Sequence, residues 1–379
     1  MFAFKDYFKI LSKLVSFDTQ SSDILAFDNN NKELIEYAAE FLEDLGFKVE
    51  LTLLPNGKYN LAANLNGKNG GMMLSSHTDT VPCDAKFWQS DPFELIQKGE
   101  NLYGLGACDM KGFAALSLLL AKNIAENGSK KPLHISLTAD EETSMIGARH
   151  FTNRSDVSPD LIIIGEPSSL HCISAHKGYM ARKAVFKGKS CHSSDPRHGI
   201  NAIKLAFLFV NELNLFEQEL KTYSDERFLV SYPTINIGAI HGGDSINRVC
   251  AEAELLFDVR PTPLFDAKKI DRRLSEITEK INERFVNAVS IEIPYPDIDV
   301  FDNKNKQILS IFEELLGEKA IGVNYCTEAS LLKNLGSTVV FGPGNIANAH
   351  QIDEHIEICE IERCYYLLEK IYGKLYSVK

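Results

Sequence analysis

A histidine and an aspartate, separated by one residue, follow a short apolar run in the first third of the chain. His77 and Asp79 come shortly after the run at 72–74. On a strand, alternate side chains point to the same side, so His77 could bind a metal ion while Asp79 holds its imidazole from behind. Taken alone, such a pair more often marks a hydrogen-bonded structural histidine. It predicts a metal site only if the chain supplies further ligands.

Acidic side chains stand at three further places where predicted strands or turns end. Asp109 lies in a glycine-rich segment just before a predicted helix, where a helix cap would also explain it. Glu141 and Glu142 belong to a run of three acids after a strand, which could be a solvated turn. Yet adjacent carboxylates repel one another unless cations neutralise them. Glu166 directly follows the apolar strand 161–164, and an acid leaving a buried strand needs a partner.

A glycine-rich loop near the far end of the chain, residues 342–354, delivers His350 after a strand. On its own, His350 would be an ordinary loop histidine. In a parallel α/β sheet, however, the carboxyl ends of the strands share one crevice. That crevice would gather His77, Asp109, Glu142, Glu166 and His350. Two imidazoles and three carboxylates suit a pair of zinc-like divalent ions bridged by Asp109, which leaves Glu141 as a base.

Length and composition limit the classes of protein to which the chain can belong. A chain of 379 residues is long enough for two domains, and 44% apolar with 24% charged residues is typical of a soluble globular protein. A net charge of −12 argues against a nucleic-acid partner. No apolar stretch is long enough to span a membrane, and the N-terminus lacks the apolar core of a signal peptide. Eight scattered cysteines without a C-x-x-C pair favour the reducing cytoplasm.

Strands and helices alternate at both ends of the chain. Strands are expected at 72–75, 134–138, 161–164 and 338–341, and helices at 32–45, 112–125, 143–151, 305–316 and toward the C-terminus. This pattern predicts an α/β catalytic domain with a mostly parallel sheet, formed by residues 1–178 and 292–379. The order strand, helix, strand, strand, helix, strand predicts an inserted α+β domain at 179–291.

Together, the motifs resemble the co-catalytic zinc aminoacylase and carboxypeptidase family over nearly the whole chain. They are HTDTVP (77–82), LYGLG and DMKG (102–112), TADEETS (138–144), IGEP (164–167), HKG (176–178), HSSDP (192–196), NAI (201–203), GGD and NR (242–248), DVRP (258–261), NYCTEA (324–329) and the loop from GPG to AHQ (342–351). The resemblance implies two divalent ions, zinc first with cobalt able to substitute. It assigns one ion to His77, Asp109 and Glu166, and the other to Asp109, Glu142 and His350.

The same resemblance implies roles for further residues. Asp79 would support His77, Glu141 would be the general acid/base, and a cis peptide would follow Asp109. The inserted domain would be a lid and dimerisation domain of a homodimer. His192 would close over the reacting carbonyl, and substrate contacts would come from Asn247, Arg260 and Thr327.

The motifs around Glu328 and from 342 to 351 favour the branch of the family that hydrolyses N2-acetyl-L-ornithine, a small N-acyl amino acid, to L-ornithine and acetate in arginine biosynthesis. Relatives acting on succinyl-diaminopimelate, acetylcitrulline or dipeptides share the metal motifs and stay open as alternatives. From a different class, an inactive dimeric binding module would have lost a ligand or the base, whereas all are present here.

Cysteines offer a last alternative. A metal-free hydrolase would use Cys108, Cys191 or Cys326, and activity retained after chelation would be its mark. Cys108 departs from the family pattern, in which a small residue without a thiol is more usual beside the bridging aspartate. We interpret it as a packed small residue, with a soft metal ligand or an oxidation site as alternatives.

Overall fold

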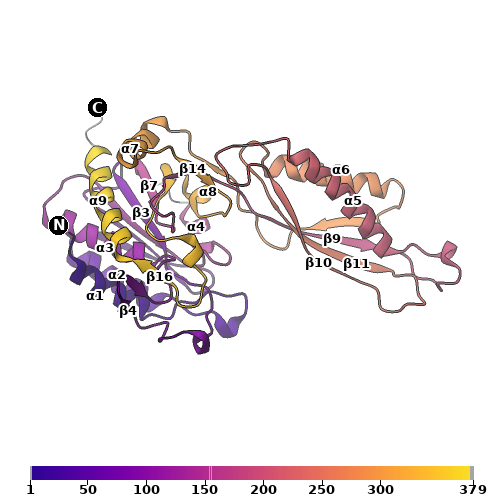
Figure 1. Ribbon diagram of the computed structural model, residues 1–379, viewed down its shortest axis with the longest axis horizontal. Helices are drawn as coiled ribbons and strands as arrows, with labels where there is room; N and C mark the ends of the chain where they lie inside the picture. Colours follow the sequence, from indigo (N-terminus) through magenta and orange to yellow (C-terminus); the bar gives the residue numbers. More distant parts are fainter. Residues whose placement is uncertain (1, 153, 155, 376–379) are drawn as a thin grey trace. The chain divides into compact units, whose positions relative to one another are not determined.

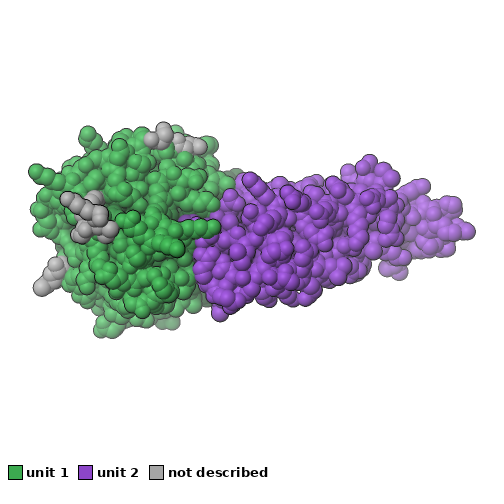
Figure 2. Space-filling model, turned by 90° about the horizontal axis from the view of Figure 1, so that it is seen from above, with its two compact units in different colours: residues 1–174, 303–321, 327–379 green, residues 175–302, 322–326 purple. Residues whose placement is uncertain are grey.

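The computed structural model describes residues 2–152, 154 and 156–375, and the chain forms two compact units (Figure 1). Unit 1 comprises residues 1–174, 303–321 and 327–379, and unit 2 comprises residues 175–302 and 322–326 (Figure 2). Unit 2 is therefore an insertion in unit 1. It begins earlier and ends later than the 179–291 segment expected from the sequence. It also includes a second, short segment at residues 322–326.

Unit 1 contains most of a nine-stranded sheet with the order β1-β2-β6-β3-β7-β15-β8-β13, to which β14 adds by pairing with β8. The strands are β1 (Lys48–Leu53), β2 (Tyr59–Leu65), β3 (Met72–His77), β6 (Leu133–Thr138), β7 (Leu161–Ile164), β8 (Ile173–His176), β13 (Phe301–Asp302), β14 (Ile321–Val323) and β15 (Ser337–Val340). The central strands β6, β3, β7 and β15 are parallel, whereas β1, β2 and β8 pair antiparallel. The predicted α/β class is confirmed.

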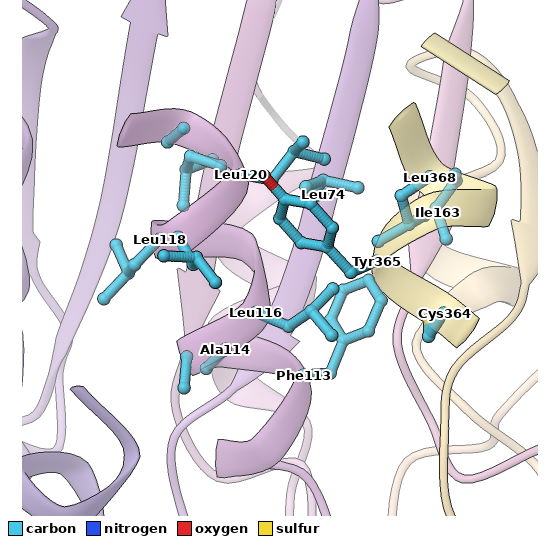
Figure 3. Packing of buried hydrophobic residues seen from close by; sticks show 14 of the residues in the cluster. Leu74, Phe113, Ala114, Leu116, Leu118, Leu120, Ile163, Cys364, Tyr365 and Leu368 are labelled. Carbon is cyan, nitrogen blue, oxygen red and sulfur yellow. The ribbon is translucent and has the colours of Figure 1, made fainter. Parts of the chain in front are cut away.

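Helices cover this sheet and position its loops. They are α1 (Phe4–Val15), α2 (Lys32–Asp44), α3 (Lys111–Glu126), α4 (Ile146–Phe151), α7 (Lys306–Leu316), α8 (Ala329–Leu332) and α9 (Ile358–Leu375), with 3₁₀ turns η1 (Leu25–Phe27), η2 (Ala85–Phe87) and η4 (Ile346–Asn348). Helix α3 is buried along most of its length because it packs against α1, α9 and β3. Phe113 and Leu116 of α3, Tyr365 of α9 and Leu74 of β3 meet in this core (Figure 3).

A small antiparallel sheet joins two loops of unit 1. It has the order β16-β5-β4, with β4 at Ile96–Lys98, β5 at Asn101–Tyr103 and β16 at His355–Glu357. His355 pairs with Tyr103. The segment that follows His350 therefore runs beside the segment that leads to Asp109.

Unit 2 has a four-stranded antiparallel sheet with the order β10-β11-β9-β12 and two helices on one of its faces (Figure 1). Its elements are β9 (Met180–Lys187), η3 (Pro196–His198), α5 (Ala202–Leu220), β10 (Thr234–Gly242), β11 (Glu252–Arg260), α6 (Ala267–Asn282) and β12 (Val289–Glu292). In its core, which is separate from the core of unit 1, the Phe209 ring meets the Phe186 ring edge-on and the Phe257 ring at a tilt. Among the described residues, no helix combines the length and apolar character needed to cross a membrane.

Candidate metal centre

Three parallel strands of unit 1 end at the same edge of the sheet, and each delivers a predicted ligand. His77 is the last residue of β3, Glu142 follows β6, and Glu166 follows β7. Because β3 lies between β6 and β7, these side chains are neighbours at the carboxyl edge, where α/β sheets bind their ligands. The other two predicted ligands, Asp109 and His350, come from the loops before α3 and after β15.

Asp109 presents one carboxylate oxygen to each of two ligand groups. Its Oδ1 is 3.1 Å from Nε2 of His77, and its Oδ2 is 3.5 Å from Nε2 of His350. Glu166 Oε2 lies 3.9 Å from the same His77 nitrogen, and Glu142 Oε1 lies 2.8 Å from the same His350 nitrogen. The structure thus brings together all five ligands predicted from the sequence, with Asp109 shared between the groups.

Glu141 lies against the same cluster. Donor atoms of His77, Glu141 and Glu166 all lie within 4.8 Å of one another, and so do those of His77, Asp109 and Glu142. A carboxylate in this position can either bind a metal ion or exchange a proton with a molecule held there.

Asp79 supports the cluster in a way that the sequence did not reveal. Its Oδ1 and Oδ2 accept hydrogen bonds from the backbone N–H groups of Glu141 and Glu142, both at 3.1 Å. The Asp79 carboxylate is 3.6 Å from Nδ1 of His77, whereas the backbone carbonyl oxygen of Asp79 is 3.0 Å from that nitrogen. Asp79 therefore orients His77 through its backbone and holds the acidic turn through its side chain.

Sequence reasoning assigned no role to Asp140, the first acid of the run. Its side chain is buried and accepts hydrogen bonds from Ser21, Asn56 and Lys58. Its backbone adopts a left-handed conformation with a φ of 59°. Asp140 thus anchors the turn that presents Glu141. No sequence signal links it to partners so far away along the chain.

Glycines shape the loop that carries Asp109. A Cβ atom at Gly112 would lie 2.3 Å from the backbone oxygen of Ala107, so only glycine fits there. Gly106 has a φ of 77°, a conformation that favours glycine. The peptide bond between Asp109 and Met110 is cis, as the resemblance implied.

Cys108 is a packed residue in this loop. It is buried, and its Sγ lies 3.5 Å from the backbone oxygen of Asn345. Burial, followed by the charges of Glu354 and Asp109, raises the pKa of the Cys108 thiol. The thiolate form that binds metals is therefore disfavoured.

Burial and charge crowding shift the pKa values of the clustered groups. Burial raises the pKa of Glu141 well above its usual value, and the charge of Glu166 adds to the effect. Burial also raises the pKa of Glu166, with a further contribution from Asp109. The hydrogen bond with Glu142 raises the pKa of His350 to about 9. The raised pKa values of Glu141 and Glu166 mean that their ionised forms are unfavourable together without a counterion, and divalent cations would supply that positive charge.

The donor set fits such cations. Among the described residues, Glu166 Oε1 is buried without a hydrogen-bond partner. A buried carboxylate oxygen without a partner is unfavourable, and a metal ion would supply one. Imidazole nitrogen and carboxylate oxygen are both zinc ligands in proteins.

Three of the predicted residues belong to unit 2. His192 is exposed and its Nδ1 is 2.8 Å from Ser194 Oγ, while the backbone of its loop pairs with the segment that contains Asn247. Arg260 ends β11, where its guanidinium lies 4.4 Å from the centre of the Tyr179 ring and its Nε donates to Asp258. The structure places these residues in unit 2, apart in the sequence from all five ligands.

The third predicted substrate contact, Thr327, is buried in unit 1 just before α8, and its Oγ1 accepts a hydrogen bond from the N–H of Ala329. The neighbouring Glu328, to which sequence reasoning gave no role, is fully buried, and burial raises its pKa to about 7. Its charge contributes to the raised pKa values of Glu141 and Glu166. Glu328 therefore belongs to the electrostatic surroundings of the centre.

The chain has relatives among known protein families, curated proteins and solved structures. The model of peptidase family M20/M25/M40 matches residues 73–374. The chain is 42% identical to an acetylornithine deacetylase of Proteus mirabilis over 94% of its own length and 93% of the relative's. It resembles the crystal structure of a tripeptidase from Staphylococcus aureus, with a TM-score of 0.77, 22% identity and 99% of each chain covered. A dinuclear metal-binding peptidase of Bacillus subtilis gives a TM-score of 0.69 at 16% identity, again over 99% of each chain.

Proposed function

The chain belongs to peptidase family M20/M25/M40, and from this premise we propose that it hydrolyses the acetamide of N2-acetyl-L-ornithine to L-ornithine and acetate. The reaction class rests on one observation, the division of the two Asp109 oxygens between a His77 group and a His350 group. The choice of substrate rests on the 42% identity with an acetylornithine deacetylase over 94% of the chain.

Two divalent ions are part of the proposal. His77, Asp109 and Glu166 would hold one, and Asp109, Glu142 and His350 the other. When bound, such a pair would make a water molecule acidic at neutral pH and polarise the acetyl carbonyl. Zinc suits the nitrogen and oxygen donors, and cobalt can take the same ligands.

Glu141 is the proposed general base and acid. Its carboxyl group lies beside both His77 and Glu166, and its backbone is fixed by Asp79. It would accept a proton from the attacking water and return it to the departing amine, which is a poor leaving group without that proton. Burial raises the pKa of this carboxyl above its usual value, which favours the protonated form that returns the proton to the amine.

Unit 2 supplies the proposed substrate contacts. His192, exposed on its loop, would stabilise the oxyanion of the tetrahedral intermediate. Asn247 and Arg260 would bind the substrate carboxylate, which a guanidinium grips through two parallel hydrogen bonds. Burial, together with the charge of Arg260, lowers the pKa of the neighbouring Lys177, so Arg260 has a second cationic group nearby. Thr327 of unit 1 completes the proposed substrate-binding set.

A homodimer is also proposed, formed through unit 2. Strand β10 is an edge strand of its sheet and exposes Ile237 and Ile240. Helix α5 exposes Phe207 and Leu215 to 60% and 62%. An exposed apolar edge strand invites pairing with another chain, and a second copy of unit 2 would cover it. None of the eight cysteines forms a disulfide, as expected for the reducing cytoplasm that we propose as the location of the protein.

A panel of substrates tests the proposed reaction. Metal-loaded protein would be assayed with N2-acetyl-L-ornithine, N-acetyl-L-citrulline, N-succinyl-L,L-diaminopimelate and a dipeptide, each followed by release of the free amine. We expect the highest kcat/KM with acetylornithine. Preference for another member would reassign the substrate within the family, and no hydrolysis of any member would favour a binding module.

A further inference from the structure

One buried carboxylate outside the proposed ligand set accepts hydrogen bonds from three backbone N–H groups of the loop that presents Asp109. Glu354 is only 2% exposed. Its Oε1 accepts hydrogen bonds from the N–H groups of Cys108 and Asp109, at 2.8 and 2.9 Å, and its Oε2 accepts one from Gly106 at 2.9 Å. One of the three bonded residues, Asp109, is itself the proposed shared ligand.

Only a carboxylate of this length can make the arrangement. All three partners are donors, and they use both oxygens of the side chain, so an acceptor is needed at each end. A glutamine would keep one oxygen but turn an NH₂ group toward a backbone N–H. An aspartate would keep both acceptors but is one methylene shorter. The three N–H groups of the loop therefore require a glutamate, because both of its oxygens accept hydrogen bonds and its side chain is long enough to reach them.

The backbone of Glu354 makes a further connection to the same loop. Its carbonyl oxygen accepts a hydrogen bond from the N–H of Gly104 at 3.1 Å, just beyond the β16–β5 ladder that pairs His355 with Tyr103. Side chain and backbone together therefore fix residues 104–109 against residues 354–357.

Glu354 also follows His350 closely on one loop, whereas Asp109 is far away in the sequence. We propose that Glu354 is a positioning residue that sets the separation of Asp109 and His350, the two ligands that face each other at 3.5 Å. Through Asp109 it acts on both ligand groups, and through its own loop it acts on His350. This inference rests on the proposed two-metal function.

Metal titration of full-length variants tests the role. Wild type, E354Q and E354D would be stripped with a chelator and titrated with Zn²⁺ by calorimetry and with Co²⁺ by visible absorption. We expect E354Q to bind both ions about 10- to 100-fold more weakly, the usual cost of removing a residue that supports ligands. The Co²⁺ spectrum, which reports ligand geometry, should change as well. Amide exchange at 106, 108 and 109 should accelerate in the metal-free variant.

D160N is the matched control. Asp160 accepts a hydrogen bond from the backbone N–H of Gly71 at 2.8 Å, at the end of β7 away from Glu166. Its removal should leave metal affinity and the Co²⁺ spectrum unchanged. If E354Q does not fold, E354D is judged by the same criteria.

Two outcomes separate this inference from the proposed function. Wild-type affinity and an unchanged Co²⁺ spectrum in a folded E354Q or E354D would overturn the positioning role while leaving the two-metal site intact. Failure of wild type itself to bind Zn²⁺ would overturn the proposed function and, with it, the inference.

Discussion

Five donor residues at strand ends or in glycine-rich loops form the proposed metal-binding cluster, and their types and positions in the chain made this grouping predictable. The structure gathers His77, Asp109, Glu142, Glu166 and His350. The residues that hold them could not be predicted in the same way. Asp140 and Glu354 act through partners distant in sequence, and nothing in local spacing links Glu354 to the backbone of Cys108. The second role of Asp79 was hidden for the same reason.

At the residue scale, Glu141→Gln tests the general base. The substitution keeps the size of the side chain and the backbone contact with Asp79, so both metal ions should remain bound. Loss of proton transfer should lower kcat by about 10²- to 10⁴-fold. Metal content by elemental analysis and kcat with acetylornithine would be measured on the same sample. Activity near that of wild type would remove Glu141 from the mechanism.

Lys177 gives a pH-dependent prediction. It is buried, its Nζ donates to the backbone oxygen of Tyr232, and burial lowers its pKa to about 8 from 10.5. Below pH 8 both folded and unfolded chains hold the proton, and the folded chain bears the full cost of the buried charge. Between pH 8 and 10.5 only the unfolded chain keeps the proton, so stability should rise with pH in this window.

The variant K177M removes this titration. Removal of the buried charge should make the variant more stable than wild type at pH 7, by up to about 3 kcal/mol. Loss of the hydrogen bond to Tyr232 should reduce this gain by an amount that does not depend on pH. The difference in free energy of unfolding should shrink as the pH approaches 10.5. Urea unfolding at several pH values measures it, with K221M as the control for removal of a surface lysine. A difference that stays constant with pH would contradict the prediction.

At the scale of elements, strands and helices near the site followed the sequence pattern except where tertiary contacts intervened. The helix expected at 143–151 begins only at Ile146, because Met145 adopts a left-handed conformation with a φ of 52° at the end of the acidic turn. Strand β2 was missed because it contains two asparagines. Asn60 and Asn64 are buried there and bonded to Gly147 and His134, partners that no local pattern reveals.

Gly165→Ala tests how β7 delivers Glu166. A Cβ atom at this position would lie 1.9 Å from the ring of Phe113 in α3. The strand end or the helix must therefore shift, at a cost of about 1–3 kcal/mol, and Zn²⁺ affinity should fall because Glu166 moves with its neighbour. Thermal unfolding and calorimetric titration measure the two effects.

Gly373→Ala in α9 is the control for this substitution, because a Cβ atom there would meet no packed neighbour within 4 Å among the residues that the structure describes. Alanine is favoured over glycine inside a helix by about 1 kcal/mol, so the control should be as stable as wild type or more so. Equal behaviour of the two variants would show that the contact with Phe113 does not position Glu166.

At the scale of the whole molecule, composition and element order predicted an inserted segment, and contacts divide the chain into two units with separate cores. Unit 2 also takes residues 322–326. That piece could not be predicted, because it joins unit 2 through contacts such as the one between Gly322 N–H and the Arg227 oxygen.

The proposed dimer is tested by charging its surface. Phe207→Glu on α5 and Ile240→Lys on β10 place charges on side chains that a second copy would bury, so the mass by sedimentation equilibrium should fall from dimer to monomer. Leu229→Lys is the control, since this residue is 94% exposed on a loop between the two elements. A monomeric wild type, or dimeric variants, would argue against this interface.

The proposed hydrolysis depends on divalent ions held by the Asp109-centred cluster. The most direct measurement titrates chelator-stripped protein with Zn²⁺ while following acetate release from N2-acetyl-L-ornithine. We predict no hydrolysis by the stripped protein and a rate that rises until two ions are bound per chain. Full activity of the stripped protein, or no activity after two ions have bound, would contradict a two-metal hydrolase.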